Sequence, residues 1–552
     1  MAPITYPQQT QRTWTWPQVR LSWLSLGLWL IGLLVLGLLL LTPLYLVLRT
    51  AEAGSAAWDL LWQSRNLAIW GRTLLLCVSV TFTSVGIAVP LAWLVHRTDL
   101  PGRKIWRVTA ALPLVIPSYV FAYLFISLFG PRGILQQWLA PLGVERLPEL
   151  YGFWGAWLVL TLISYPYVYL TTSAALRRLD PCQLEAARSL GLSAGAAFWR
   201  IILPQLRPAI VAGGLMVALY TLRDFGAVTL LRYSTFTRAI YVQYQSFFDR
   251  SLAAALALQL VLLTAVILYF EWRSRGRAQY GRGSIGVARQ PELHTLGAWR
   301  WPALAYVSGL MGMALFVPTA ALGYWVWRGL NQDWGIRAVA GRANVVNPWE
   351  LWVPATNSVV VALLAAVVTV ALTLPVVVLV MRRRNGFTQF LEQFTYAGFA
   401  LPGIVIALAM VYFGANYARP LYQTLPLLLV AYVVLFIPQA MGTIRGSFLQ
   451  LPRHVEEAGR SLGKGSAAVF TRITLPLVQP GLLAGGALVF LTAMKELPAT
   501  LLLSPMGFTS LPMHIWSNIS EAFFAEAALP TLLLILLSSV PLAFLQAGLG
   551  SA

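Results

Sequence analysis

Twelve long apolar runs constrain this sequence more than any other feature. A helix needs about 20 apolar residues to cross the ~30 Å hydrocarbon core of a bilayer. Runs of that length lie near 25–48, 73–95, 108–130, 151–174, 208–231, 252–271, 302–327, 357–381, 393–415, 422–442, 479–503 and 525–547. They predict an all-α polytopic membrane protein with six spans in residues 1–273, six in 301–552, and a cytoplasmic linker at 274–300.

The composition agrees with a chain that is surrounded by lipid. Of its 552 residues 58% are hydrophobic and 11% are charged, whereas soluble domains carry about 25% charged residues. The mean hydropathy is +0.70. A net charge of +20 is typical of nucleic-acid binders as well, but no polar basic domain is present here. The sequence therefore predicts a lipid bilayer as partner and excludes nucleic acid.

Lysine and arginine gather in alternate loops, and this asymmetry predicts the orientation. Basic loops follow the second, fourth, sixth and eighth runs, and such loops face the cytoplasm. Examples are Arg97, Arg103, Lys104 and Arg107 after the second run, and Arg382, Arg383 and Arg384 after the eighth. Both termini are then cytoplasmic. Six spans in each half make the two halves parallel, which excludes transporters built from inverted repeats.

No constellation of catalytic or metal-binding residues is visible in the sequence. The two cysteines have neither a disulfide nor a zinc spacing, and the four histidines are far apart. No nucleophile and base occur together, and no glycine-rich phosphate loop with Lys and Ser or Thr is present. We therefore expect no enzymatic activity, no ATP hydrolysis and no cofactor in this chain.

One loop sequence occurs twice. Residues 185–204 read EAARSLGLSAGAAFWRIILP and residues 457–476 read EAGRSLGKGSAAVFTRITLP, with twelve of twenty positions identical at a constant shift of 272. Both lie between the fourth and fifth spans of their half. Loops normally diverge faster than the elements they connect. The likeness therefore indicates two copies of one contact surface, although recent duplication is an alternative.

The repeated segment has the chemistry of a docking surface. Residues before Gly191 and Gly463 have close to helical spacing, and glycine commonly ends a helix. Small residues follow, with one aromatic side chain, Phe198 or Phe470. Small side chains allow close approach of a partner, and a lone aromatic can fill a pocket as an anchor.

The repeated segment resembles the signature loop of the permeases of binding-protein-dependent ABC importers. That pattern is Glu-Ala-Ala, three residues, Gly, nine residues, Ile, one residue, Leu-Pro. The second copy departs from it at Gly459, which stands in place of the second alanine and costs about 1 kcal/mol of helix stability. The matching residues are Glu185, Ala186, Ala187, Gly191, Ile201, Leu203 and Pro204 in the first copy, and Glu457, Ala458, Gly463, Ile473, Leu475 and Pro476 in the second.

This resemblance implies a type I ABC importer permease fold in a bacterial inner membrane. Each loop then forms a coupling helix in a groove of a cytoplasmic ATPase homodimer, and ATP and Mg²⁺ belong to that partner. A periplasmic binding protein delivers the cargo. The residues expected to couple to the ATPase are Glu185, Ala186, Ala187, Gly191, Phe198, Glu457, Ala458, Gly463 and Phe470.

The fifth and eleventh runs each carry a basic residue followed by an acidic one. The same shift of 272 pairs Arg223 with Lys495 and Asp224 with Glu496. A charge within the membrane costs about 2.5–3.5 kcal/mol on insertion scales, so it normally faces a cavity or a partner. We interpret these four residues, with Pro498, as the translocation path or its gate, and Asp224 and Glu496 as contacts for a metal cation. The alternative is ion pairing that only braces the helices.

Longer stretches resemble the ferric-iron permeases of this family. They are residues 224–263 in the first half and, in the second, 495–503 and 509–534. The resemblance implies Fe³⁺ as cargo and a periplasmic ferric-iron binding protein as partner, while thiamine, phosphonate and polyamine permeases share the same fold. An ATP-independent secondary transporter is the other class with six-plus-six parallel repeats. There the repeated loop follows the second and eighth spans, whereas here it follows the fourth and tenth.

Overall fold

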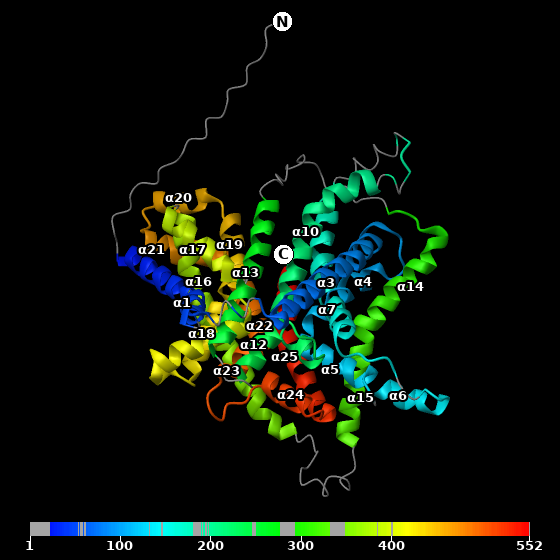
Figure 1. Cartoon of the computed structure of the whole chain (residues 1–552). Helices are drawn as coiled ribbons and strands as arrows, with labels where there is room; N and C mark the ends of the chain where they lie inside the picture. Colours follow the sequence, from blue (N-terminus) through cyan, green and yellow to red (C-terminus); the bar gives the residue numbers. More distant parts are fainter. Residues whose placement is uncertain are drawn as a thin grey trace.

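The computed structural model describes residues 23–52, 54–55, 59, 62–131, 133–144, 147–179, 189, 191–193, 196, 198–245, 250–275, 293–331, 348–383, 385–398 and 401–550. These residues form helices, and the one β-bridge recorded among them joins Thr98 to His294. Figure 1 shows the helices gathered into one bundle with the short helix α20 (Arg453–Ser461) at one end. We call that end the coupling end, and α24 (Leu511–Ser520) lies near the opposite one.

Within the described residues, ten helices are long and apolar enough to cross a membrane. The ninth and twelfth predicted runs correspond to shorter apolar helices, 403–416 and 524–540. The principal helices of the first half are α1 (Trp23–Glu52), α3 (Ser64–Arg97), α5 (Ser118–Phe129), α7 (Phe153–Arg178), α10 (Leu203–Arg223) and α13 (Arg250–Arg275). Those of the second are α14 (Arg300–Met311), α15 (Val317–Asn331), α16 (Trp352–Arg382), α17 (Gly386–Ala397), α18 (Gly403–Asn416), α19 (Leu425–Gln450), α22 (Leu475–Ala493) and α25 (Phe524–Gly550).

The two halves repeat the same three-helix packing. Helix α10 packs against α3 and α7, and α22 packs against α16 and α19. Glycines allow the close approach: a Cβ on Gly213 would lie 2.7 Å from Val168 Cα of α7, and one on Gly485 would lie 2.7 Å from Thr443 Oγ1 of α19. Because these glycines are separated by the same 272 residues, the repeat seen in the loops extends into the membrane helices.

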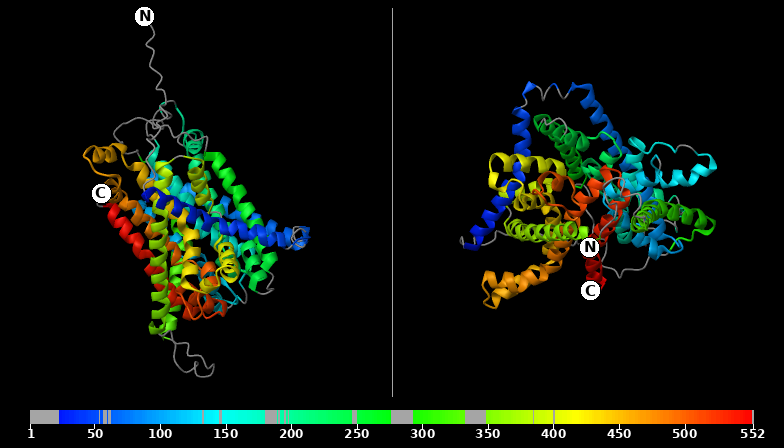
Figure 2. Two further views of the ribbon diagram at one scale, coloured as in Figure 1. Left: turned by 90° about the vertical axis from the view of Figure 1, so that its left-hand side faces the viewer. Right: turned by 90° about the horizontal axis from the view of Figure 1, so that it is seen from below.

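Each half places its first helix against the other half. Helix α1 packs on α16, α17 and α18 of the second half, where Trp29 meets Phe387 with ring centroids 5.1 Å apart. Figure 2, seen from below, shows α1 beside those helices. Helix α15 packs against α5, and the Tyr306 hydroxyl of α14 donates to the Ile87 carbonyl at 2.7 Å. The predicted halves 1–273 and 301–552 are therefore interlocked in space.

Two predicted spans are broken where prolines occur. The run at 108–130 consists of α4 (Arg103–Thr109), a 3₁₀ turn at Leu112–Val115 and α5, and the run at 393–415 consists of α17 and α18. Pro117 and Pro402 are the N-caps of α5 and α18 with extended backbone. Proline disfavours helix continuation because its ring clashes with the preceding turn and it has no N–H to donate, although other helices of this chain contain a proline, as α3 does at Pro90. The breaks bring helix N-termini into the interior of the bundle.

The end of the predicted linker is attached to the first half. Thr98 and His294 form the bridge, with the Asp99 N–H donating to the His294 carbonyl at 3.2 Å. The Asp99 carboxylate accepts the Leu296 N–H at 2.9 Å. Most of the linker, 276–292, lies outside the described residues. Its described end thus sits on the loop that follows α3.

Candidate functional site

Asp224 occupies a break between two helices. Helix α10 ends at Arg223 and α11 (Gly226–Leu230) begins two residues beyond Asp224. The carboxylate Oδ1 accepts the N–H groups of Ala227 at 3.0 Å and Val228 at 3.3 Å, and the Ser118 side chain hydrogen-bonds the same carboxylate. These are the free donors of the first turn of α11. Asp224 is therefore a buried cap, rather than a charge inside a continuous helix as the apolar run predicted.

Glu496 occupies the equivalent break in the second half. Helix α22 ends at Ala493 and α23 (Pro498–Leu503) begins two residues beyond Glu496. Glu496 Oε1 accepts the Ala499 N–H at 3.4 Å, and its backbone carbonyl accepts the Thr500 hydroxyl at 2.7 Å. The long distance to Ala499 makes this a weaker cap than that of Asp224. Pro498, predicted to loosen the helix, is the first residue of α23.

The two basic residues reach across to the other half. The Lys495 ammonium donates to the carbonyls of Leu114 at 3.1 Å and Val115 at 3.4 Å, in the 3₁₀ turn before α5. Arg223 interacts electrostatically with Glu496. The predicted Arg/Asp and Lys/Glu neighbours therefore bind outside their own pair. Together they join the two halves at the level of the helix breaks, so a bracing role and a role in gating are both consistent with the geometry.

The two carboxylates are matched to the helices that face them. Shifted by 285 residues, Ser118 at the start of α5 corresponds to Gly403 at the start of α18. A Cβ on Gly403 would overlap Glu496 Oε1. The longer glutamate therefore faces a glycine, and the shorter aspartate faces a serine that hydrogen-bonds it.

Gly403→Ala tests this match. The added methyl group must displace the Glu496 carboxylate, since the overlap involves the end of that side chain. We expect cargo uptake to fall by about fivefold, because a displaced charged partner costs about 1 kcal/mol. The measurement is the uptake rate in reconstituted vesicles at equal protein content. Gly214→Ala in α10 is the control, because its Cβ would lie in ordinary contact 3.5 Å from Thr81. Equal loss in both variants would contradict the match.

Glu496 lines a small cavity, and Asp224 is not among the residues that line it. The cavity has a volume of about 10 Å³ for the centre of a water-sized sphere, which is room for about one water molecule or ion. Its polar lining comprises Ser358, Tyr432, Glu496, Thr500 and Ser510. Asp224 is 6% exposed and held by its capping bonds. No group of three or more His, Cys, Asp or Glu in the described part of the chain is placed to hold a metal. The predicted cation contacts therefore remain a prediction of transient binding.

Helix α20 and the glycine after it form the second copy of the repeated segment. Helix α20 ends at Ser461, and Gly463 has φ +78°, which is a left-handed conformation that favours glycine. Gly191 in the first copy has φ +83°. Both predicted helix stops thus adopt the conformation of a C-terminal cap. Glu185, Ala186 and Ala187 lie outside the described residues.

Several side chains of the second copy are exposed at the coupling end. Glu457 and Ala458 are exposed, and Leu462 is 80% exposed. An exposed leucine beside Glu457 and Ala458 belongs to the surface that the repeated segment offers at this end. Leu462 was not among the predicted coupling residues. The available signal was its identity with Leu190 at the same place in the first copy.

The two aromatic residues of the segment pack inward. The Phe198 ring lies 5.0 Å from Trp93 of α3, and the Phe470 ring lies 5.6 Å from the guanidinium carbon of Arg382. The anchor expected to fill a pocket of the ATPase therefore contacts its own permease half. Inward packing also explains why glycine stands at position 459 in place of the alanine of the family pattern. A Cβ there would lie 2.5 Å from Ile473 Cδ1.

Each repeated segment contains a π-helical turn that leads into the following membrane helix. The turns are Phe198–Ile202 before α10 and Phe470–Thr474 before α22. Such turns are rare and often occur at functional sites. From these turns α10 and α22 run about 30 Å to the breaks at Asp224 and Glu496. Each helix thus connects one repeated segment to one acidic residue.

Comparison with known proteins agrees with a repeated permease architecture. The family model described as binding-protein-dependent transport system inner membrane component matches residues 84–271 and 355–551. One match lies in each predicted half.

Several individual relatives are similar over long stretches. The chain is 36% identical over 526 residues to the Fe(3+)-transport system permease protein FbpB 2 of Haemophilus influenzae, covering 95% of this chain and 98% of the relative. It is 24% identical over 483 residues to the ferric transport system permease protein FbpB of Actinobacillus pleuropneumoniae, covering 85% and 69%. It is 29% identical over 271 residues to the sulfate transport system permease protein CysT of Escherichia coli, covering 48% and 95%.

Proposed function

The chain belongs to the family of inner membrane components of binding-protein-dependent transport systems, and from this premise we propose that it imports ferric iron. It is a multi-pass permease of an ABC importer and not an enzyme. The observation that supports iron most strongly is the 36% identity with a Fe(3+) permease over 95% of the chain. The sulfate permease matches about half of this chain, so it supports the fold of one half more than the cargo.

The proposed partners are a separate cytoplasmic ATPase homodimer, which carries ATP and Mg²⁺, and a periplasmic ferric-iron binding protein. The coupling end faces the cytoplasm together with both termini, in agreement with the basic loops. Each ATPase subunit binds one repeated segment. Glu457, Ala458 and Leu462 form the docking surface of the second half, and Glu185, Ala186 and Ala187 are the corresponding residues of the first.

The proposed mechanism links the two ends of α10 and α22. When the ATPases close, they move the repeated segments, and the helices carry this motion to the breaks at Asp224 and Glu496. There Lys495 and Arg223 join the two halves, so a relative movement of the halves must change these contacts. Because Glu496 lines a cavity, its carboxylate is the proposed contact for the passing cation. Hard carboxylate oxygens suit a highly charged ion.

Reconstitution tests this function. The chain is purified with its cognate ATPase and placed in vesicles with the ferric-loaded binding protein outside and ATP inside. We expect radioactive iron to accumulate only when ATP and the binding protein are both present. The control replaces ATP with a non-hydrolysable analogue.

Other outcomes would select other functions. Accumulation without any ATPase would identify a secondary transporter. ATP-dependent uptake of thiamine, a phosphonate or a polyamine with its own binding protein, but not of iron, would keep the ABC mechanism and change the cargo. In either case the proposal for ferric iron would be withdrawn.

A further inference from the structure

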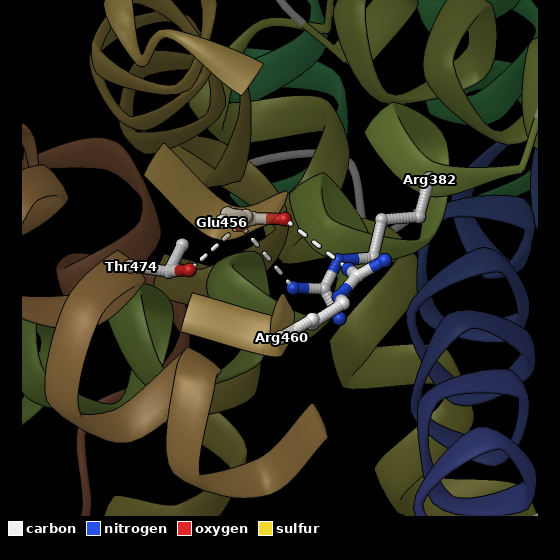
Figure 3. A network of polar contacts seen from close by, with 4 residues as sticks. All are labelled: Arg382, Glu456, Arg460 and Thr474. Atoms are coloured by element: carbon white, nitrogen blue, oxygen red, sulfur yellow. Dashed lines mark hydrogen bonds and ion pairs between the residues drawn. The ribbon is translucent and has the colours of Figure 1, made fainter. Parts of the chain in front are cut away.

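The Glu456 side chain connects helix α20 to the turn before α22 and to the end of α16. Figure 3 shows the carboxylate between Thr474, Arg382 and Arg460. Its Oε1 accepts the Thr474 hydroxyl at 2.7 Å and lies 3.5 Å from Arg382 Nη2, while Oε2 lies 3.5 Å from Arg460 Nη2. Arg460 belongs to α20 itself, so only the first two contacts leave the helix.

The two outward contacts reach the elements that carry the segment's motion into the membrane. Thr474 is fully buried and is the last residue of the π-helical turn before α22. Arg382 is the last residue of α16, and its guanidinium also lies over the Phe470 ring in the same turn. One carboxylate therefore connects the docking helix, the joint behind it and a neighbouring membrane helix.

The sequence of the first half lacks the carboxylate at the position equivalent to Glu456. At the shift of 272 residues, Leu184 stands in place of Glu456 and Ile202 in place of Thr474. Leu184 lies outside the described residues, and Ile202 is buried. Arg97, which corresponds to Arg382 at a shift of 285, donates to the Leu176 carbonyl at 2.5 Å instead. The position of Glu456 thus carries a carboxylate in the second half and an aliphatic side chain in the first.

We propose that Glu456 is a positioning residue that transmits movement of the second docking helix to α16 and α22. Glu457, its neighbour, is exposed for the ATPase, whereas Glu456 faces inward, so the two glutamates have separate tasks. When the ATPase moves α20, the bonds to Thr474 and Arg382 make the joint follow it. In the first half the equivalent positions carry Leu184 and Ile202, which have no polar group to make these bonds. The inference rests on the proposed coupling of the repeated segments to an ATPase.

The experiment measures iron transported per ATP hydrolysed in vesicles containing the chain and its ATPase. Glu456→Gln keeps the size of the side chain and removes its charge. Thr474→Val removes the hydroxyl bond and leaves the carboxylate in place. We expect each to lower the transport-to-hydrolysis ratio by about fivefold, while the ATPase still co-purifies at the wild-type ratio. Thr474→Ser, which retains the hydroxyl, restores the ratio.

Glu392→Gln is the matched control. Glu392 of α17 pairs with Arg445 of α19 at 2.6 Å and is about as exposed as Glu456, so its ion pair joins two helices other than α20. We expect its ratio to equal that of the wild type. A normal ratio in Glu456→Gln would overturn the inference, and so would a parallel loss of hydrolysis, transport and co-purification, which would indicate a structural role only. Transport by the wild type without ATP would instead overturn the proposed function.

Discussion

Replacing Glu496 with glutamine lowers ATP-driven iron uptake by about thirtyfold, as we expect from the loss of about 2 kcal/mol when a charged partner is removed from a buried pair. Glutamine preserves the length of the side chain, so it still fits beside Gly403. It removes the negative charge that faces Arg223 and that borders the cavity. The measurement is the initial rate of iron accumulation in vesicles, with ATP hydrolysis recorded in parallel.

Asp224→Asn is the matched variant in the first half. Asparagine retains an oxygen that can accept the N–H groups of Ala227 and Val228, so the cap of α11 is preserved. We expect uptake to fall by only about twofold, because Asp and Asn are about equally good at accepting these capping bonds. A difference of about fifteenfold between the two variants would show that transport depends on the charge of Glu496 far more than on that of Asp224.

The two results together distinguish carboxylates that contact the cargo from carboxylates that only brace the helices. Equal and large losses would place both carboxylates in the path, against the asymmetry inferred from the cavity. Normal uptake in both variants would assign Glu496 and Asp224 to bracing alone. Measuring the thermal stability of each purified variant shows whether a loss comes from unfolding.

Much of this architecture follows from the sequence because the membrane allows few alternatives. A helix must contain about 20 apolar residues to cross a bilayer. The number of such runs and their division into halves were therefore predictable. Gly191 and Gly463 were also predictable as helix stops, because both occur at the end of the same helical pattern. The left-handed backbone at Gly463, just after the end of α20, confirms that interpretation for the second copy. Gly191 is left-handed as well, and residues 180–188 before it lie outside the described residues.

The helix breaks were less predictable because an apolar run does not show whether the helix that it forms is continuous. Pro117 and Pro402 were visible as prolines inside apolar runs, but a packed bundle can also tolerate proline within a helix. Asp224 and Glu496 lie between helices because they cap the helix that follows. The sequence shows the charges and not the free N–H groups that hold them.

Contacts between the halves could not be predicted from a single sequence. Nothing in the composition of α1 specifies that it packs on α16 to α18 as well as on α13 of its own half, since both surfaces are apolar. The same is true of Lys495, whose partners are backbone carbonyls of Leu114 and Val115. Backbone acceptors leave no mark on side-chain patterns. The inward packing of Phe198 and Phe470 was missed for a related reason, because an aromatic residue suits a pocket on either side of a loop.

Changing both Glu185 and Glu457 to alanine is expected to abolish stimulation of ATP hydrolysis by the binding protein. Each glutamate begins one docking segment, and an anchor at the centre of an interface costs about 2 kcal/mol or more when truncated. Iron uptake then falls by about thirtyfold or more. The measurement compares hydrolysis with and without the ferric-loaded binding protein in the purified complex.

The single variants decide whether the two segments act together. If the ATPase dimer must grip both halves to move them apart, then Glu457→Ala alone already removes most of the stimulation, and the second change adds little. If the segments act independently, each single variant retains about half of it. Glu392→Ala, on a residue of α17 that pairs with Arg445 of α19 and belongs to neither repeated segment, serves as the control. Stimulated hydrolysis that survives in the double variant would remove the coupling role from the repeated segments. The duplication of the loop would then record ancestry rather than mechanism.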